Sequence, residues 1–351
     1  MFTQKLLKWW HHHQRPLPWK QTDDAYSIWL SEIILQQTRI DQGLPYYLKF
    51  KAMYPTVKDL ADSSLDEVMR LWEGLGYYAR ARNMHQTAKY IANELQGKFP
   101  DTYSDIRQLK GIGDYTAAAI ASFAFGLPYA VVDGNVYRLL SRCFGIFTPI
   151  DSTQGKKQFL ALAQQLMSET EPASFNQAIM DFGSVQCKPV KPDCGFCPMQ
   201  TICVAYRDNT VSQLPVKQKK LTRKTRYFTY FMLQTPKGGR LLRKRTAKDI
   251  WENLYEFLLV ETDLEPDAGI LQSHFRENQI SCIYLTEKSL YNSRIWKQQL
   301  THQTIVARFL ETSISDPEIW LRQGFVEVEA ENIGNYAFPK IINNYLQHRP
   351  I

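Results

Sequence analysis

The sequence contains no hydrophobic run that approaches the roughly 18 residues of a membrane-spanning helix. Its first residues also lack the order of basic, apolar and small residues that marks a signal peptide. It has no internal repeat and no low-complexity tract, and 44% of its 351 residues are hydrophobic. These features exclude membrane-spanning and disordered proteins, and they predict a soluble, cytoplasmic chain with two packed domains.

A strong net charge is also absent, because the sequence has 42 Lys and Arg residues and 35 Asp and Glu residues, which gives a formal charge of +7. Residues 1–210 are nearly balanced, with 22 basic and 20 acidic side chains. The excess is concentrated in a run without any acid, made up of Lys217, Lys219, Lys220, Arg223, Lys224 and Arg226. This run could lie along an acidic partner such as DNA, and a solvated linker explains it equally well.

Apolar residues recur at three- and four-residue spacing up to about residue 205, which is typical of helices buried on one face. The helices expected there span 25–38, 65–71, 80–95, 116–125, 136–144 and 156–167. After residue 226 the pattern changes to short alternating or β-branched runs. The strands expected there span 227–233, 240–245, 257–261, 282–285, 304–310 and 324–329, and a helix over 339–346 follows. The sequence therefore predicts an all-α domain, a basic linker over 208–226 and an α+β domain over 227–351.

Four of the six cysteines fall within 17 residues, in the order Cys187-x6-Cys194-x2-Cys197-x5-Cys203. Prolines and a glycine between them favour turns, so that the segment can wrap one ion or cluster. Four thiolates suit either tetrahedral zinc or a [4Fe-4S] cluster, and the spacing alone leaves both open.

A glycine-containing turn, Leu109-Lys110-Gly111-Ile112-Gly113, precedes the helix expected over 116–125. Two glycines one residue apart let the backbone turn sharply and approach a ligand closely. Amides at the helix N-terminus would then face an anion such as phosphate, which makes Gly111 and Gly113 candidate DNA-binding residues. A plain connection between two helices is the alternative.

Two carboxylates are candidates for catalysis. Asp133 precedes the helix expected over 136–144, where it would act as the N-cap. A capping carboxylate accepts backbone N–H groups, which lowers its pKa and keeps it ionised. Glu32 lies among apolar residues of the helix expected over 25–38, and burial there would raise its pKa. One neutral and one charged carboxyl form the pairing that breaks glycosidic bonds, as proton donor and as stabiliser of positive charge.

The order of these features resembles the helix-hairpin-helix DNA glycosylases of the endonuclease III superfamily, and within it the adenine-specific branch. The resemblance rests on the hairpin, on residues 131–136 (VVDGNV) and on the cysteine spacing. Residues 29–38 (WLSEIILQQT) and 74–83 (GLGYYARARN) match the adenine-specific branch. The resemblance implies a helix-hairpin-helix glycosylase domain over 1–207, with a [4Fe-4S] cluster rather than zinc at the cysteine loop, residues 187–203.

Carried over by motif, the resemblance implies that Glu32 protonates adenine at N7 and later activates water. Asp133 would stabilise or covalently trap the oxocarbenium-like sugar, which Tyr115 and Asn135 would orient. The adenine must first be flipped out of the duplex, because its stacked glycosidic bond is out of reach. The implied adenine pocket consists of Arg15, Leu17, Trp19 and Asp181. The residues implied to probe or wedge the base stack are Gln37, Thr38, Leu75 and Tyr77, with burial in the core as the alternative for Tyr77.

The implied substrate is double-stranded DNA in which adenine is mispaired with 8-oxoguanine or G, bound by a monomer at the nucleoid. Tyr115 stands where bifunctional members of the superfamily carry a Schiff-base lysine, so we expect a monofunctional hydrolase. One alternative is a bifunctional oxidised-pyrimidine glycosylase with lyase activity, which Tyr115 opposes. The other is a non-enzymatic iron-sulfur DNA-binding protein, which the pairing of Glu32 with Asp133 opposes.

The second half resembles, more loosely, the Nudix-like domain with which the adenine-specific branch recognises 8-oxoguanine. Residues 241–245 (LLRKR) and 250–257 (IWENLYEF) carry this resemblance. Leu300-Thr301-His302 stands where the family has Phe-Ser-His, which implies that Thr301 and His302 contact the lesion. Residues 269–280 lack the paired glutamates that hold Mg²⁺ in a working pyrophosphatase, so we expect a domain that binds without hydrolysis.

Overall fold

The chain folds into two compact units, as shown by a computed structural model that describes residues 1–218, 222–277 and 293–348. Unit 1 comprises residues 1–62 and 83–220, and unit 2 comprises residues 63–82 and 221–351. The strand expected over 282–285 lies outside the described residues, as do Lys219 and Lys220 of the basic run. None of the helices in the described ranges is both long and apolar enough to cross a membrane.

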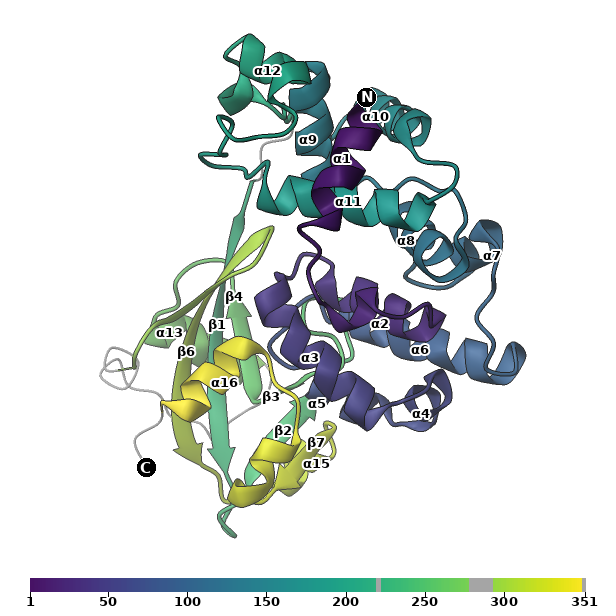
Figure 1. Cartoon of the computed structure of the whole chain (residues 1–351). Coiled ribbons are helices and arrows are strands. Elements are labelled where there is room, and N and C mark those ends of the chain that lie inside the picture. Colours follow the sequence, from purple (N-terminus) through teal and green to yellow (C-terminus); the bar gives the residue numbers. More distant parts are fainter. Residues whose placement is uncertain (219–221, 278–292, 349–351) are drawn as a thin grey trace. The chain divides into compact units, whose positions relative to one another are not determined.

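Unit 1 is built from helices (Figure 1). They are α1 (Phe2–His11), α2 (Ala25–Leu35), α3 (Ile40–Met53), α4 (Val57–Asp62), α6 (Ala79–Glu94), α7 (Tyr103–Gln108), α8 (Asp114–Phe125), α9 (Gly134–Phe144), α10 (Thr153–Leu166), α11 (Pro172–Val185) and α12 (Val204–Arg207). The all-α prediction for this half is confirmed, and α2 ends three residues before its expected limit at Thr38. It ends there because Gln36 leaves the helical conformation (ψ 112°) and Gln37 adopts a left-handed one (φ 57°).

Helices α9 and α11 pack against each other in the main hydrophobic core of unit 1. Val136, Leu139, Leu140 and Cys143 recur at helical spacing on α9, so that one face of this helix is buried in the main hydrophobic core. The two helices come close together at Gly183 of α11. A Cβ atom added there would lie 2.7 Å from the backbone oxygen of Asn135, so glycine is what allows the close approach.

Unit 2 contains a seven-stranded mixed sheet. Its strands are β1 (Lys224–Gln234), β2 (Arg240–Lys244), β3 (Tyr255–Glu256), β4 (Leu258–Thr262), β5 (Trp296–Gln299), β6 (Gln303–Ser313) and β7 (Phe325–Val328). The helices in the described residues of this unit include α5 (Leu65–Leu71), α13 (Ala268–Glu277), α15 (Glu318–Leu321) and α16 (Lys340–Gln347). Strand β1 is central, because it pairs in parallel with β6 and antiparallel with β2 and β4.

Helices cover both faces of this sheet. Tyr230 of β1 stacks on Phe309, which in turn stacks on Tyr345 of α16. The next residue, Phe231, packs edge-on against Phe275 of α13. Since consecutive side chains of a strand point to opposite faces, α16 and α13 lie on opposite sides of the sheet. The prediction of an α+β second half is therefore confirmed.

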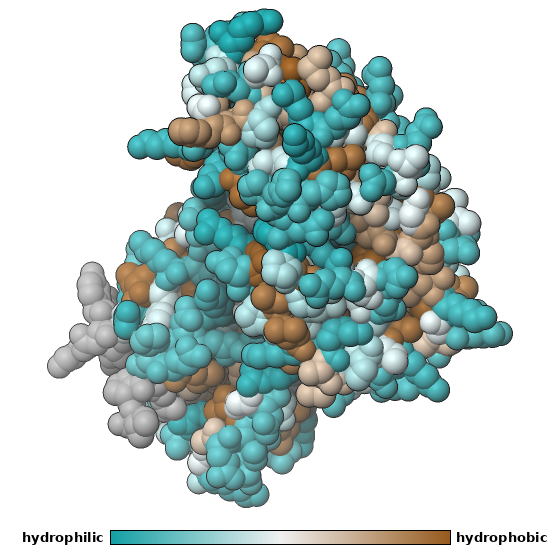
Figure 2. All heavy atoms as spheres, viewed as in Figure 1, coloured by the Kyte–Doolittle hydropathy of each residue, from teal (hydrophilic) through white to brown (hydrophobic). Residues whose placement is uncertain are grey.

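Residues 63–82 belong to unit 2 through polar contacts with its sheet. Lys244 of β2 forms an ion pair with Asp66 of α5, and the hydroxyl of Tyr255 donates to the same carboxylate at 3.3 Å. Arg82 forms a second ion pair, with Glu252, at 2.8 Å. Hydrophilic residues predominate on the face of the molecule seen in Figure 2.

The substitution Gly183→Ala is expected to lower the free energy of unfolding by about 1–3 kcal/mol, because the new methyl group must displace the backbone of Asn135. Chemical denaturation followed by circular dichroism measures this change. Gly334→Ala is the matched control, since a Cβ atom there has no neighbour within 4 Å. Equal stability of the two variants would mean that the contact between α9 and α11 tolerates the methyl group.

Candidate active site

A cleft of about 1090 Å³ in unit 1 brings together candidate residues that are far apart in the sequence. It is lined by twelve of the residues that the sequence singled out, namely Arg15, Leu17, Trp19, Glu32, Gln37, Thr38, Gly111, Gly113, Tyr115, Asp133, Asn135 and Asp181. The hairpin, both candidate carboxylates and the implied adenine pocket therefore share one cavity, which no spacing in the sequence could demonstrate.

Glu32 is buried in this cleft, with 8% of its surface exposed. It projects from α2, where its neighbours Trp29, Ile33 and Ile34 are core residues. Burial raises the pKa of Glu32 to about 7, although a hydrogen bond with Tyr115 opposes the shift. The predicted rise is confirmed, and such a carboxyl can donate a proton near neutral pH.

Asp133 is the N-cap of α9, as predicted. Its Oδ1 accepts the backbone N–H groups of Asn135 and Val136, at 2.9 and 2.8 Å. The expected direction of its pKa was wrong: burial raises the pKa of Asp133, against the lowering effect of these hydrogen bonds. Desolvation of a half-buried carboxyl in a cleft outweighs the capping bonds.

Tyr115 and Asn135 hold the two carboxylates in place. Tyr115, in the first turn of α8, forms a hydrogen bond with Glu32, and burial raises the pKa of the phenol well above its ordinary value. Asn135 donates from Nδ2 to Oδ2 of Asp133 at 2.7 Å. Its own Oδ1 accepts a hydrogen bond from Arg138 at 2.9 Å, and Arg138 also donates to the carbonyl of Cys187 at 2.8 Å. Arg138 thus connects the cap of α9 to the cysteine loop, a role that sequence reasoning missed.

Asp181 forms the charged floor of the implied adenine pocket. Its carboxylate is fully buried and receives Arg15 Nε at 2.9 Å, Lys20 Nζ at 2.5 Å and Trp10 Nε1 at 3.1 Å. An unpaired charge buried in this way would be strongly destabilising, so both cations are needed. Burial lowers the pKa of Lys20, while Asp181 acts in the opposite direction. Sequence reasoning missed Lys20 and Trp10, although Lys20 directly follows the candidate residue Trp19.

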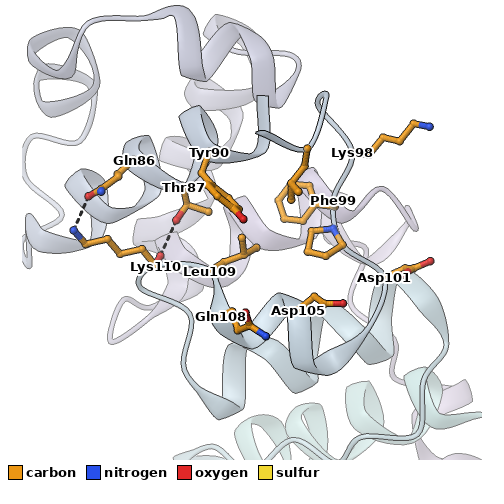
Figure 3. Close-up of a pocket in the computed structure, with 12 residues that line it drawn as sticks. Gln86, Thr87, Tyr90, Lys98, Phe99, Asp101, Asp105, Gln108, Leu109 and Lys110 are labelled. Carbon is orange, nitrogen blue, oxygen red and sulfur yellow. Dashed lines mark hydrogen bonds between the residues drawn. The ribbon is translucent and has the colours of Figure 1, made fainter. Parts of the chain in front are cut away.

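The hairpin joins α7 to α8. Gly111 has φ +80°, and a Cβ atom there would lie 2.7 Å from Cβ of Asn83, so glycine is required on both counts. Gly113 is the N-cap of α8 and provides no side-chain acceptor, which leaves the first amides of α8 available to an anion. Figure 3 shows how α6 supports the turn: Thr87 donates to the carbonyl of Lys110 at 2.8 Å, beside a second pocket of about 630 Å³.

The remaining candidates for DNA contact belong to unit 2. Tyr77 is 46% exposed and has a left-handed backbone (φ 49°), so the alternative of a core tyrosine is wrong. Its hydroxyl forms a hydrogen bond with that of Thr301, and His302 beside it is exposed. Leu75 is 7% exposed, so its side chain packs within the protein.

The cysteine loop follows α11 and ends at Cys203, the N-cap of α12. Cys187, Cys197 and Cys203 pack against the main core of unit 1. Nη1 of Arg142 lies 3.4 Å from Sγ of Cys187, and a hydrogen bond from the buried Cys143 lowers the pKa of Cys203 to about 6. Across the described ranges, no three cysteine, histidine or acidic side chains converge closely enough to hold a single metal ion.

Comparison with known proteins identifies relatives of the chain. Residues 30–167 match the HhH-GPD superfamily of base excision DNA repair proteins. The chain is 37% identical over 268 residues to the adenine DNA glycosylase of Buchnera aphidicola subsp. Schizaphis graminum, covering 76% of each protein. It is 42% identical over 222 residues to the human adenine DNA glycosylase, covering 61% of this chain and 41% of the human one.

A solved structure, described as that of a thermostable thymine-DNA glycosylase, is similar in fold. It superposes with a TM-score of 0.55 at 31% identity and covers 59% of this chain and 95% of that one.

Glu32→Gln is expected to slow base release at least about 100-fold, because the amide occupies the same space but cannot donate the proton. In the unaltered protein the rate should fall as the pH rises through about 7, where Glu32 loses its proton. Single-turnover cleavage between pH 6 and 9 measures both effects, and Glu94→Gln on the exposed side of α6 is the control.

The same pKa has a consequence for stability. The folded protein holds the proton of Glu32 up to about pH 7, whereas the unfolded chain releases it near pH 4.5. The unaltered protein should therefore lose stability relative to Glu32→Gln as the pH rises from 4.5 to 7. A pH-independent difference between the two would contradict the raised pKa.

Proposed function

Since the chain belongs to the adenine DNA glycosylase family, it is a hydrolase that removes adenine from DNA in base excision repair, and we propose that it acts on adenine paired with 8-oxoguanine or G, without a lyase step. The observation that carries this proposal is the placement of Glu32 and Asp133 in one cleft, with Tyr115 and Asn135 as their partners. Residues 1–207 would form the excision domain and residues 227–351 a Nudix-like reader of the lesion.

Excision would begin with adenine flipped into the cleft, where Arg15, Leu17 and Trp19 line the space above Asp181. Glu32, kept neutral by burial, would protonate N7 of adenine and so make the base a better leaving group. The glycosidic bond then breaks, and positive charge develops on the sugar. Ionised Asp133, held by its capping bonds, would stabilise that charge until water, activated by Glu32, completes hydrolysis.

Two features support a monofunctional reaction. Tyr115 stands at the hairpin position where a lyase needs an amine, and a phenol cannot form a Schiff base. The amine of Lys20 also lines the cleft, but its Nζ lies 2.5 Å from the buried carboxylate of Asp181 and is engaged in that ion pair. Hydrolysis is then the route that the cleft supports.

Recognition of 8-oxoguanine would fall to unit 2. Tyr77 and Thr301 are joined there by a hydrogen bond, so a residue that wedges the base stack and a residue that contacts the lesion would act together. His302 is exposed beside them. Helix α13 carries Glu277 as its one acidic residue, which supports binding without pyrophosphatase activity.

We also propose that the cysteine loop holds a [4Fe-4S] cluster. Cys187, Cys194, Cys197 and Cys203 would supply four thiolates from a single loop, and three of them pack against the main core of unit 1. The N–H group of Arg142 near Cys187 and the S–H group of Cys143 near Cys203 are suitable donors to thiolate ligands. A bound cluster would fix the path of the loop between α11 and α12.

The substrate is tested with three duplexes, which carry A opposite 8-oxoguanine, A opposite G, and thymine glycol. We expect strand cleavage at adenine in the first, and more slowly in the second, only after alkali treatment, because hydrolysis leaves an abasic site. Borohydride should trap little covalent DNA adduct. Cleavage confined to thymine glycol without alkali would overturn the proposal in favour of a lyase, and cleavage of A:G alone would overturn 8-oxoguanine recognition.

The purified protein should be brown and contain about four iron atoms per chain. Cys197→Ser is expected to lose this iron, whereas Cys282→Ala, which alters a cysteine outside the loop, should retain it. Iron analysis and visible absorption measure both. A colourless protein with one zinc per chain would contradict the cluster.

A further inference from the structure

The first half of the expected linker is part of unit 1. The backbone N–H of Ile150 donates to the carbonyl of Val216 at 3.0 Å, and the N–H of Gln218 donates to Oδ1 of Asp151 at 2.9 Å. Leu214 is 2% exposed, so this segment also has an apolar anchor. Residues 211–218 therefore follow a fixed path along unit 1, although their composition is that of a solvated connection.

Arg142 of α9 holds this segment by hydrogen bonds to its backbone. Its guanidinium is buried, and its Nε donates to the carbonyls of both Val211 and Leu214 at 3.1 Å. Its Nη groups donate to the carbonyls of Lys188 and Pro189 at 2.8 and 3.2 Å. One buried side chain thus holds the cysteine loop and residues 211–218 against the same helix.

The fixed segment borders the excision cleft. Ser212, Leu214, Pro215 and Lys217 all line it, together with Pro189 of the cysteine loop. They line the same cavity as Glu32 and Asp133, so a strand whose adenine enters this cavity would lie close to this border. The border is therefore in a position to contact the DNA backbone.

Lys217 differs from the other cations of the cleft. Arg15 and Lys20 are neutralised by Asp181, and Arg138 and Arg142 are directed at protein carbonyls and at Asn135. Lys217 is exposed, and it has no hydrogen bond or ion pair with any other residue that the structure describes. The nearby carboxylate of Asp151 is engaged by the N–H of Gln218. A free lysine at the mouth of a DNA-binding cleft is suited to a phosphate.

We propose that residues 211–218 form a wall of the excision cleft and that Lys217 binds a backbone phosphate of the adenine-containing strand next to the flipped nucleotide. The proposal rests on DNA entering the cleft as set out for the proposed function. The wall would hold the flanking phosphate while the base turns into the pocket. Lys217 would then act as a positioning residue in this step and take no part in the chemistry.

Binding of an A:8-oxoguanine duplex tests this role, with full-length protein that carries Glu32→Gln so that adenine stays in place. Lys217→Ala should lose about threefold less affinity than the parent when the salt concentration rises from about 50 to 200 mM. The reason is that one phosphate contact fewer reduces the slope of log K against log salt by about one. Lys217→Glu should bind more weakly still, and Lys217→Arg should retain the parent slope.

Lys58→Ala is the matched control, because Lys58 is an exposed lysine of α4 that does not line the cleft. It makes the same change in net charge and should leave the slope unaltered. A parental slope for Lys217→Ala, or the same change in both variants, would overturn the phosphate contact. The salt dependence of binding can also be measured with an A:G duplex. The test of Lys217 therefore does not depend on 8-oxoguanine recognition, which the excision assay tests separately.

Amide hydrogen exchange tests the wall itself. The N–H groups of Ile150 and Gln218 should exchange slowly in the free protein, since both are hydrogen-bonded in the structure. Exchange of both at the rate of an unprotected chain would show that residues 211–218 are a free linker and would overturn the proposed wall.

Discussion

The hydrogen bonds that begin α9 govern the arrangement of the whole excision site. Asp133 has to accept the N–H groups of Asn135 and Val136 for the helix to start, and the same bonds aim its second oxygen at Asn135. One turn further, Arg138 reaches the cysteine loop, and after another turn Arg142 reaches residues 211–218. A single helix therefore sets the position of Asp133, the carboxylate proposed to act in catalysis, and of two borders of the cleft. Its close contact with α11 at Gly183 keeps that helix in place.

Burial in the cleft makes ionisation of its two candidate carboxyl groups less favourable. Burial raises the pKa of both Glu32 and Asp133, because desolvation destabilises the anionic form of each carboxyl group. Asp133 is compensated by capping bonds and by Asn135, whereas Glu32 has Tyr115 as its hydrogen-bond partner. This difference fits the two proposed roles, because the carboxyl with less compensation is the better proton donor and the capped one has more hydrogen bonds to stabilise its anion.

Much of this architecture could be predicted from the sequence, because it depends on local rules. The cap at Asp133, the turn at Gly111 and the change from helical to strand periodicity after residue 226 are all local, and the structure has them. Helix α3 lies in the region expected to be helical, but it was not among the clear cases because Gly43 and Pro45 interrupt its pattern. The sign of the pKa shift at Asp133 was wrong because burial depends on residues far away in the chain.

Long-range contacts explain the remaining gaps. Lys20 and Trp10 become visible only when Asp181, more than 160 positions later, is placed beside them. Residues 211–218 look like a linker because most of their bonds involve the backbone, which carries no signature in the sequence. The membership of residues 63–82 in unit 2 likewise depends on partners such as Lys244 and Glu252.

The membership of residues 63–82 in unit 2 means that neither unit is a single continuous segment of the chain. Because unit 2 takes up residues 63–82 from the middle of unit 1, the polypeptide passes between the units at both ends of this segment and again near residue 220. A protease that cuts the connection near residue 220 would not yield two complete units, since Asp66 and Arg82 would remain with the first fragment and their partners with the second. Splitting the gene at that point would likewise separate residues 63–82 from the Lys244 and Glu252 side chains with which they form ion pairs.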